Sequence, residues 1–443
     1  MMRALVVGVV AACGFPRPAD VGEGSPCTQT ACAAGQLAVC GASGVVESVE
    51  SCALGCADDH GRCARVAPSN ALSDALDLAA SQPPITLPAG TVIDSDTGVI
   101  GAAGSTVVVA TLTVPQAGGP TIRVLLARSW DLRGVRVRGA LPVAFVAAED
   151  IRVAGVLDVS ADGITSGPGA AACGSDGGAG DWGQVYFARS TTDDSAAGYP
   201  TFRMRANGAG GGGFGAAGGR GGVVDVGLHI GNGGIVNGLA ELVPLRGGCA
   251  GGGDAPGSPP LIHHGGGGGA VQLVAGQAVR LLGGPGVGTI HAGGGGGPAA
   301  TLGTSGPGDP TQQSEAGGGG SGGGVLIEAR SVALDDATLI LAGGGGGGGA
   351  GPCMPAPDGG DAQPSDVIAR GGACPVGTLH AVSGGDGATA GDGSPGAALA
   401  DAACGGGGGG LGRIRINTAD GKYGAGPSTL LRGVVTTGLV GRR

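Results

Sequence analysis

Blocks of almost pure glycine, such as residues 343–349 and 405–410, alternate along this chain with short aliphatic segments. Glycine accounts for 105 of the 443 residues, without the Gly-X-Y period of collagen. A glycine within a regular element destabilises a fold by roughly 0.5–1 kcal/mol relative to alanine. The chain therefore needs a continuous core made by its aliphatic segments, or it must stay partly unfolded.

The side chains available for such a core are mostly small or branched aliphatic ones. The chain has only two Trp, three Tyr and five Phe, and 13% of its residues are charged. Its formal net charge is −10, and Lys422 is its single lysine. Because the chain is acidic and has no basic patch, we expect no nucleic-acid partner.

The amino terminus, "MMRALVVGVVAACG", has a short positive region at Arg3 followed by an apolar run of signal-peptide length. Small residues precede Cys13, and this ending resembles the bacterial lipobox. The resemblance implies that residues 1–13 form a lipoprotein signal, with Cys13 as the lipid-bearing first residue of the mature chain. Gly14, where an Asp would signal retention in the inner membrane, then favours the outer membrane or cell surface. An ordinary cleaved signal peptide and a misplaced start codon are the alternatives.

A cluster of cysteines follows a linker over residues 14–26. An even, dense cluster without aromatic neighbours in an exported chain is typical of a small module held by disulfides, here residues 27–66. The C-x4-C, C-x7-C and C-x3-C spacings lack the paired C-x2-C of zinc ribbons, so a metal site is the weaker alternative. The six cysteines are Cys27, Cys32, Cys40, Cys52, Cys56 and Cys63.

Five further cysteines lie in or beside the glycine-rich segments, where disulfides could link long loops to one another. Their number is odd, so we expect one to stay free or to pair outside this set. These residues are Cys173, Cys249, Cys353, Cys374 and Cys404.

Apolar residues at helical spacing behind Ser69 and Asn70 predict a capped helix over about 69–81, ended by Pro83 and Pro84. The following "ITLPAGTVID" predicts a strand, a tight turn and another strand. A helix followed by "LPAGT" resembles the entry to right-handed parallel β-helices of the pectate-lyase-like class. In such a fold the helix would cover the exposed end of the first coil.

Internal repetition favours the same fold. Residues 127–139, 148–161 and 329–342 each begin with Ala and place apolar residues three and five positions later. The first two copies start 21 residues apart, a plausible length for one coil. Residues 270–284 form a looser copy, and the alternating "LGRIRINTADG" at 411–421 predicts a last strand.

We therefore expect an all-β chain in which residues 67–443 form a right-handed parallel β-helix. The aliphatic segments would form the coils, and the glycine blocks would be long loops or extended polyproline-II strands packed backbone to backbone. The ending "GGGGGGLGRIRI" at 405–416 resembles glycine-rich exported lipoproteins of Gram-negative bacteria. That resemblance covers about residues 70–443 and implies no known activity.

Charged residues near the repeated segments could form a catalytic groove, as in β-helical polysaccharide lyases and hydrolases. Alternation with Val and Leu makes a solvated strand face the stronger interpretation. His263 and His264, and the "GGDGATAGDG" of 384–393, resemble metal sites only weakly, and we expect no metal and no cofactor. The charged residues in question are Asp150, Asp158, Asp162, Arg133, Arg136 and Arg138.

Residues 181–208 hold half of the ten aromatic residues, with acidic residues beside them. Aromatic faces with nearby carboxylates could bind a sugar or a protein, although packing of an insertion onto the coil is the stronger interpretation. The candidate ligand-binding residues are Trp182, Tyr186, Tyr199, Asp193 and Asp194.

Three classes of function stay open. We favour a non-enzymatic surface lipoprotein with a structural or adhesive role, bound to the membrane by its lipid and meeting a polysaccharide or a surface protein. The alternatives are a polysaccharide lyase or hydrolase on the same scaffold, and a ligand-recognition module built on packed polyglycine strands.

Overall fold

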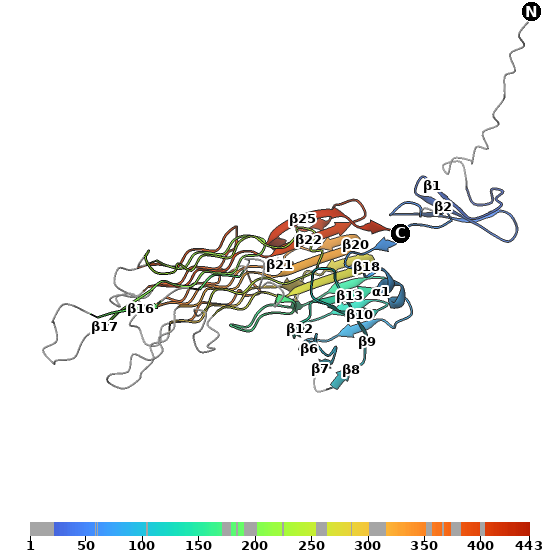
Figure 1. Ribbon diagram of the computed structural model, residues 1–443. Coiled ribbons are helices and arrows are strands. Elements are labelled where there is room, and N and C mark those ends of the chain that lie inside the picture. The colour runs from blue at the N-terminus through green and yellow to red at the C-terminus, as the bar shows by residue number, and fades with distance from the viewer. Residues whose placement is uncertain are drawn as a thin grey trace, which may run out of the picture. The chain divides into compact units, whose positions relative to one another are not determined.

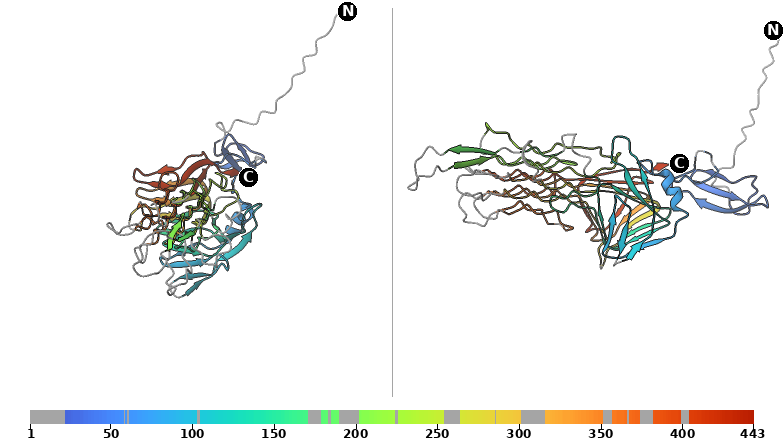
Figure 2. Two further views of the ribbon diagram at one scale, coloured as in Figure 1. Left: turned by 60° about the vertical axis from the view of Figure 1, so that its left-hand side comes forward. Right: turned by 60° about the horizontal axis from the view of Figure 1, so that its bottom comes forward.

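The computed structural model is almost entirely β-structure and divides into two compact units. The first unit comprises the chain up to Ala67 together with Gly441–Arg443, and the second is Pro68–Val440. Figures 1 and 2 show the chain from three directions. The structure describes residues 22–57, 59, 61–102, 105–170, 179–182, 185–189, 202–223, 226–253, 264–284, 286–300, 316–350, 357–365, 367–373, 382–398 and 404–443.

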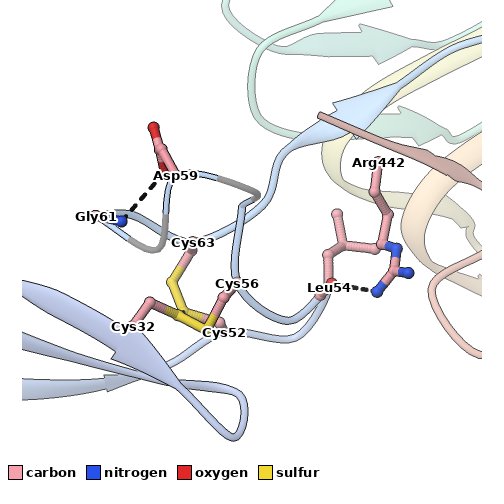
Figure 3. Close-up of a disulfide and its surroundings, with 8 residues drawn as sticks. All are labelled: Cys32, Cys52, Leu54, Cys56, Asp59, Gly61, Cys63 and Arg442. Carbon is pink, nitrogen blue, oxygen red and sulfur yellow. Dashed lines mark hydrogen bonds between the residues drawn. A yellow bond between two sulfur atoms is a disulfide. The ribbon is translucent and has the colours of Figure 1, made fainter. Parts of the chain in front are cut away.

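The first unit contains three antiparallel strands, β1 (Ala31–Ala33), β2 (Gln36–Cys40) and β3 (Val46–Ser51). All six clustered cysteines are in disulfides, as predicted, and the structure supplies the pairing that the sequence left open. The bonds are Cys27–Cys40, Cys32–Cys56 and Cys52–Cys63. Two of these disulfides lie side by side, since Sγ of Cys32 is 3.4 Å from Sγ of Cys52 (Figure 3).

The last three residues of the chain complete this first unit. Strand β26 (Gly441–Arg442) pairs antiparallel with β4 (Val66–Ala67). Nη1 of Arg442 donates to the carbonyl oxygen of Leu54 at 3.2 Å, as Figure 3 shows. These residues therefore group with the first unit, whereas the sequence indicated that they belong to the glycine-rich part.

The second unit begins with the one helix among the described residues, α1 (Ser73–Ala79). It is shorter than the expected 69–81, because Asn70 and Ala71 have φ of 57° and 59° and so cannot continue a right-handed helix. Leu72 is the N-cap residue and makes no side-chain cap bond, so the expected Ser69/Asn70 cap is wrong. The Ser69 side chain instead donates to Glu328 at 2.7 Å.

Helix α1 buries Ala75, Leu76 and Ala79 and packs on strands of a large sheet. Six strands of that sheet are parallel to one another, and an antiparallel strand, β9 (Ala110–Val114), follows β10 at one margin. The parallel strands, in spatial order, are β25 (Val434–Leu439), β22 (Arg413–Thr418), β20 (Gly324–Leu334), β18 (Ala270–Leu281), β13 (Val143–Ala147) and β10 (Ile122–Ala127).

A row of shorter strands extends this sheet. It joins β5 (Ile85–Leu87), β11 (Trp130–Leu132) and β14 (Ile151–Val153) to the second half of β18. The two-residue strand β23 (Gly424–Ala425) pairs with the second half of β20.

A second sheet contains one strand from each successive repeat. Five of its strands are parallel neighbours of one another, followed by β6 in the same direction and by two antiparallel strands. In spatial order the strands are β24 (Leu430–Arg432), β21 (Leu339–Leu341), β19 (Thr289–His291), β15 (Val156–Asp158), β12 (Val135–Arg138), β6 (Thr91–Asp94), β7 (Ile100–Ala102) and β8 (Ser105–Val107).

The predicted stacking of the repeats is confirmed by the strand register. Trp130 lies beside Ile151, Ile151 beside Val279, and Val279 beside Val332. A parallel row joins Leu132, Val153, Leu281 and Leu334, two positions further on. These rows are buried in one continuous aliphatic core shared by the two sheets. Burial of these aliphatic side chains contributes favourable free energy of folding, which opposes the destabilising effect of the many glycines.

Several described glycine segments are extended and either leave the second sheet or lead into the first (Figure 1). Residues 292–300 and 342–350 follow β19 and β21, whereas 316–323 and 404–412 precede β20 and β22. They are packed against one another, so the alternative of open loops is wrong for these residues. A short antiparallel hairpin, β16 (Val185–Arg189) and β17 (Phe202–Ala206), lies between two such segments of the chain.

Candidate functional site

The glycine strands form a bundle, hereafter the glycine bundle, in which each strand contacts several others. Along 406–410, Gly406 and Gly409 donate to the strand 345–348, whereas Gly407 and Gly410 donate to the strand 209–212. The amide of Gly408 donates to a third neighbour, the carbonyl oxygen of Ser394, at 2.9 Å. A repeat of three residues with neighbours in three directions is the geometry of polyproline-II strands, and not that of a β-ladder.

Backbone atoms fill the space that side chains would need inside this bundle. A Cβ atom at Gly320 would overlap the carbonyl group of Gly266, and one at Gly409 would overlap that of Gly320. Residues 316–324 and 404–412 are buried throughout. Glycine is therefore required at Gly320 and Gly409 by the close approach of neighbouring strands.

Outer strands of the glycine bundle show the same three-residue repeat in their exposure. Between 367 and 373, Val367, Arg370 and Ala373 are exposed, whereas Ala369 and Gly372 are buried. One residue in three therefore points to solvent and can vary in chemistry without disturbing the packing.

Aspartates accept hydrogen bonds from backbone amides of the glycine bundle. Asp361 accepts from Gly163 at 3.1 Å and from Gly296 at 2.7 Å, and Asp358 accepts from Ala299 at 2.8 Å. Asp386 and Asp392, both within the "GGDGATAGDG" segment, accept from other backbone amides of the bundle. These carboxylates satisfy backbone donors, which buried amides require.

The aromatic region contains a stacked pair that the sequence did not predict. The rings of Trp182 and His229 lie 4.0 Å apart with an interplanar angle of 8°. Nε2 of His229 is 2.9 Å from a carboxylate oxygen of Asp181. Both members of that polar pair are about one-third exposed, so the cluster is open to solvent.

The other aromatic-region candidates are only partly described. Tyr186 lies in β16, where its backbone pairs with that of Arg205 in β17. Tyr199, Asp193 and Asp194 lie outside the described residues. Because His229 is distant in sequence from the aromatic segment, no local pattern could have identified it.

A second candidate lies across the outer face of the second sheet. The register places Arg136, Asp158 and His291 side by side on β12, β15 and β19. Nδ1 of His291 is 3.1 Å from Asp158, and Arg136 is 3.2 Å from Asp162 and 3.8 Å from Asp158. Arg138 completes the group at 3.9 Å from Asp162. Four of the six charged residues considered from sequence therefore meet here, together with His291, which was not predicted.

The remaining two predicted residues lie elsewhere and have structural partners. Asp150 accepts a hydrogen bond from the backbone amide of Ala278 at 3.0 Å. Arg133 is bound to Asp131 at 2.7 Å, near the surface. Neither joins the group formed by Arg136, Asp158 and His291.

Asp158 is held in its charged form. Burial alone would raise the pKa of this carboxyl, but hydrogen bonds from His291 and Ser160 outweigh it and lower the pKa to about 2. A general acid in sugar hydrolysis needs the opposite shift, upward toward neutrality. Asp158 therefore provides a fixed negative charge on the sheet face and is not suited to act as a general acid at neutral pH.

Other predicted positions are described incompletely. Cys249 is disulfide-bonded and Cys404 is buried. Cys13, Cys173, Cys353, Cys374 and His263 lie outside the described residues. Within the described ranges, no three His, Cys, Asp or Glu residues are arranged to hold a metal ion.

A search for membrane-crossing helices found none of sufficient length and apolarity in the described part of the chain. No protein-family model, curated protein sequence or solved structure matches this chain.

Proposed function

We propose that the protein is a non-enzymatic, lipid-anchored surface protein whose glycine bundle displays an adhesive surface. The observation that carries the proposal is the bundle itself, in which buried backbones are in direct contact. Such packing leaves little room for internal motion, and it exposes one residue in three of an outer strand. A rigid body with variable outward positions suits binding to an external partner.

The charged group on the second sheet supports a non-catalytic role. Its carboxylates are paired with Arg136, Arg138 and His291. Asp158 stays ionised at neutral pH, since its pKa is lowered to about 2. An ionised carboxylate such as that of Asp158 stabilises a sheet face and lacks the raised pKa of a glycosidase acid.

The two sheets support the interpretation of the second unit as a right-handed parallel β-helix. Successive repeats contribute one strand to each sheet, and the register repeats from coil to coil. On this interpretation α1 and the antiparallel strands β7 to β9 close the first coil. The glycine bundle then extends from one side of the coils.

Export and lipidation are supported by the chemistry of the first unit and by the sequence before it. Three disulfides form and persist in oxidising compartments outside the cytoplasm. Residues 1–13 resemble a lipoprotein signal, with Cys13 as the acylated residue. We infer an outer-membrane or cell-surface location.

Fractionation of cells that express the full chain tests the anchor. The unmodified chain should float with outer membranes and incorporate a radiolabelled fatty acid. Cys13→Ser should lose both properties, whereas Gly14→Asp should keep the fatty acid and move to the inner membrane. A Cys13→Ser chain that still carries fatty acid would contradict the proposal.

The exposed cluster formed by Asp181, Trp182 and His229 is the best-supported contact point for a partner. Its aromatic and polar groups suit a polysaccharide or a surface protein, since sugars stack on Trp and bind carboxylates by their hydroxyls. Cells that display the chain should be retained on immobilised bacterial polysaccharides, or on cells that carry them.

Trp182→Ala tests this contact, with Val367→Ala as the matched control. Val367 is 60% exposed on an outer strand of the bundle, so its truncation also removes exposed apolar surface. The Trp182 variant should lose about tenfold in retention, the scale of one aromatic contact, and the control should retain its binding. Equal retention of both variants and the unmodified chain would remove this cluster from the adhesive surface. Release of new reducing sugar ends would contradict a non-enzymatic role.

A further inference from the structure

Strand β25 forms one margin of the large sheet, shown in red in Figure 1. It pairs with β22 on one side, and no described strand pairs with its other side. The opposite margin ends in β9, an antiparallel strand that pairs with β10. Among the described strands, β25 is therefore an outermost strand of this sheet with one side unpaired.

The open strand exposes residues that face the core side of the sheet. Its register places Val435 beside Ile414 and Leu439 beside Thr418, with Thr437 beside Ile416 between them. Ile414 and Ile416 are buried in the core, yet Val435 is 36% exposed and Leu439 is 69% exposed. These aliphatic side chains face the core side of the sheet but have no neighbouring strand to cover them, so the core is incomplete at this margin.

The segment around residue 240 lies on the other face of β25. The hydroxyl of Thr436, which alternates with Val435 and Thr437 and so points away from the core side, donates to the carbonyl oxygen of Ala240 at 3.2 Å. That contact leaves the core-facing residues Val435, Thr437 and Leu439 exposed.

We propose that β25 pairs with β25 of a second copy of this chain, antiparallel and with a two-fold axis at Thr437. In that register Val435 lies opposite Leu439 of the second copy, and Thr437 lies opposite Thr437 of the second copy. The exposed residues Val435, Thr437 and Leu439 are thus complementary to themselves, as a two-fold interface requires.

The chemistry of the strand favours this partner over an unrelated one. The sequence of β25, "VVTTGL", contains no charge, so its own copy brings no like-charged residues into register. It also lacks the lysine or proline that commonly protects an exposed margin. An antiparallel partner on an otherwise parallel sheet is an ordinary arrangement for an added strand.

Cysteine cross-linking of the full chain in the bacterial envelope tests the proposed axis. Thr437→Cys places two thiols opposite each other across the axis, at a separation that a disulfide spans. After mild oxidation it should yield a dimer on a non-reducing gel. Thr436→Cys is the matched control, because in this register residue 436 lies opposite residue 438 on the other face of the sheet, and it should yield about tenfold less dimer.

A charged residue at the same strand supplies the second test. Val435→Lys, added to Thr437→Cys, should abolish the cross-link, because two buried lysines would lie beside the axis without partners. Val99→Lys adds the same charge at a 53% exposed valine directly before β7, which belongs to the other sheet, and should leave the cross-link unchanged. Equal cross-linking of Thr436→Cys and Thr437→Cys, insensitivity to Val435→Lys, or a cross-link from Thr437→Cys to a different protein would each overturn the proposal.

Discussion

The two sheets and the glycine bundle both have a densely packed interior, but the sheets fill it with side chains and the bundle fills it with backbone. In the sheets, rows such as Trp130, Ile151 and Val279 fill the interior with side chains. In the bundle, Gly320, Gly266 and Gly409 bring backbones into contact, and no side chain intervenes. One chain thus contains a core of side chains and a core of peptide groups.

The two cores gain stability from different interactions. The aliphatic core removes apolar surface from water, which contributes about 25 cal/mol per Å² of buried apolar area. The glycine bundle buries peptide groups, and its stability depends on satisfying them, as the bonds from Gly406–Gly410 to three neighbouring strands illustrate. The aliphatic core should therefore tolerate small changes in side-chain volume, whereas the buried glycine positions of the bundle should tolerate none.

Addition of one methyl group inside the bundle should give the largest effect. At Gly320 a Cβ would overlap the carbonyl group of Gly266, and both strands are held on all sides. Gly320→Ala should destabilise the second unit by about 3 kcal/mol or more, the upper range for overpacking. The midpoint of urea unfolding, followed by circular dichroism, measures this loss.

Gly360→Ala is the matched control for that variant. Gly360 is exposed on an outer strand, and the nearest atom to an added Cβ there is the carbonyl oxygen of Arg370 at 3.5 Å. Its stability should change by less than about 0.5 kcal/mol. If Gly320→Ala proved as harmless as Gly360→Ala, the bundle would be loosely packed and the contrast between the cores would fail.

The charged group on the sheet should add a pH dependence of intermediate size. The pKa of Asp158 is lowered from 3.8 to about 2, so its ionised form stabilises the fold above pH 3.8. This contribution is about 2 kcal/mol at neutral pH and should be lost as the pH falls through about 2.

The comparison with Asp158→Asn isolates this contribution from that of other acidic groups. The stability difference between the unmodified chain and the variant should shrink as the pH falls from 3.8 to about 2. Urea unfolding at a series of pH values measures it. A difference that stays constant over this range would show that the charge of Asp158 is not what stabilises the sheet face.

The aliphatic half of the fold was largely predictable because its side chains alternate. Repeated spacing placed Trp130, Ile151 and Val332 in one row, and the register has them there. The start of α1 was not predictable from spacing, since left-handed conformations at Asn70 and Ala71 delay it. His291 was missed because its partner, Asp158, is distant in sequence and is brought close by strand stacking.

For the glycine-rich segments, the sequence predicted extended or loop structure but not which segments contact one another. A run such as 405–410 has no side chains to specify a partner, so its contacts with 209–212 and 345–348 leave no pattern in the sequence. One of the few local patterns in these segments is an acidic residue beside glycines, as at Asp361 and Asp386. In the sequence this pattern could equally indicate a calcium-binding repeat. The structure shows instead that each carboxylate accepts a hydrogen bond from a backbone amide.

Removal of one methyl group from the aliphatic core should have a smaller effect than either Gly320→Ala or the loss of the Asp158 charge. Ile290 is fully buried between the sheets, and Ile290→Val should destabilise the second unit by about 1 kcal/mol, measured by the same urea unfolding. Neighbouring aliphatic side chains can shift to fill part of the gap, whereas the peptide groups around Gly320 cannot shift without breaking hydrogen bonds. A loss at Ile290→Val as large as that at Gly320→Ala would mean that the aliphatic core is as intolerant of volume changes as the glycine bundle, and the contrast between the two would fail.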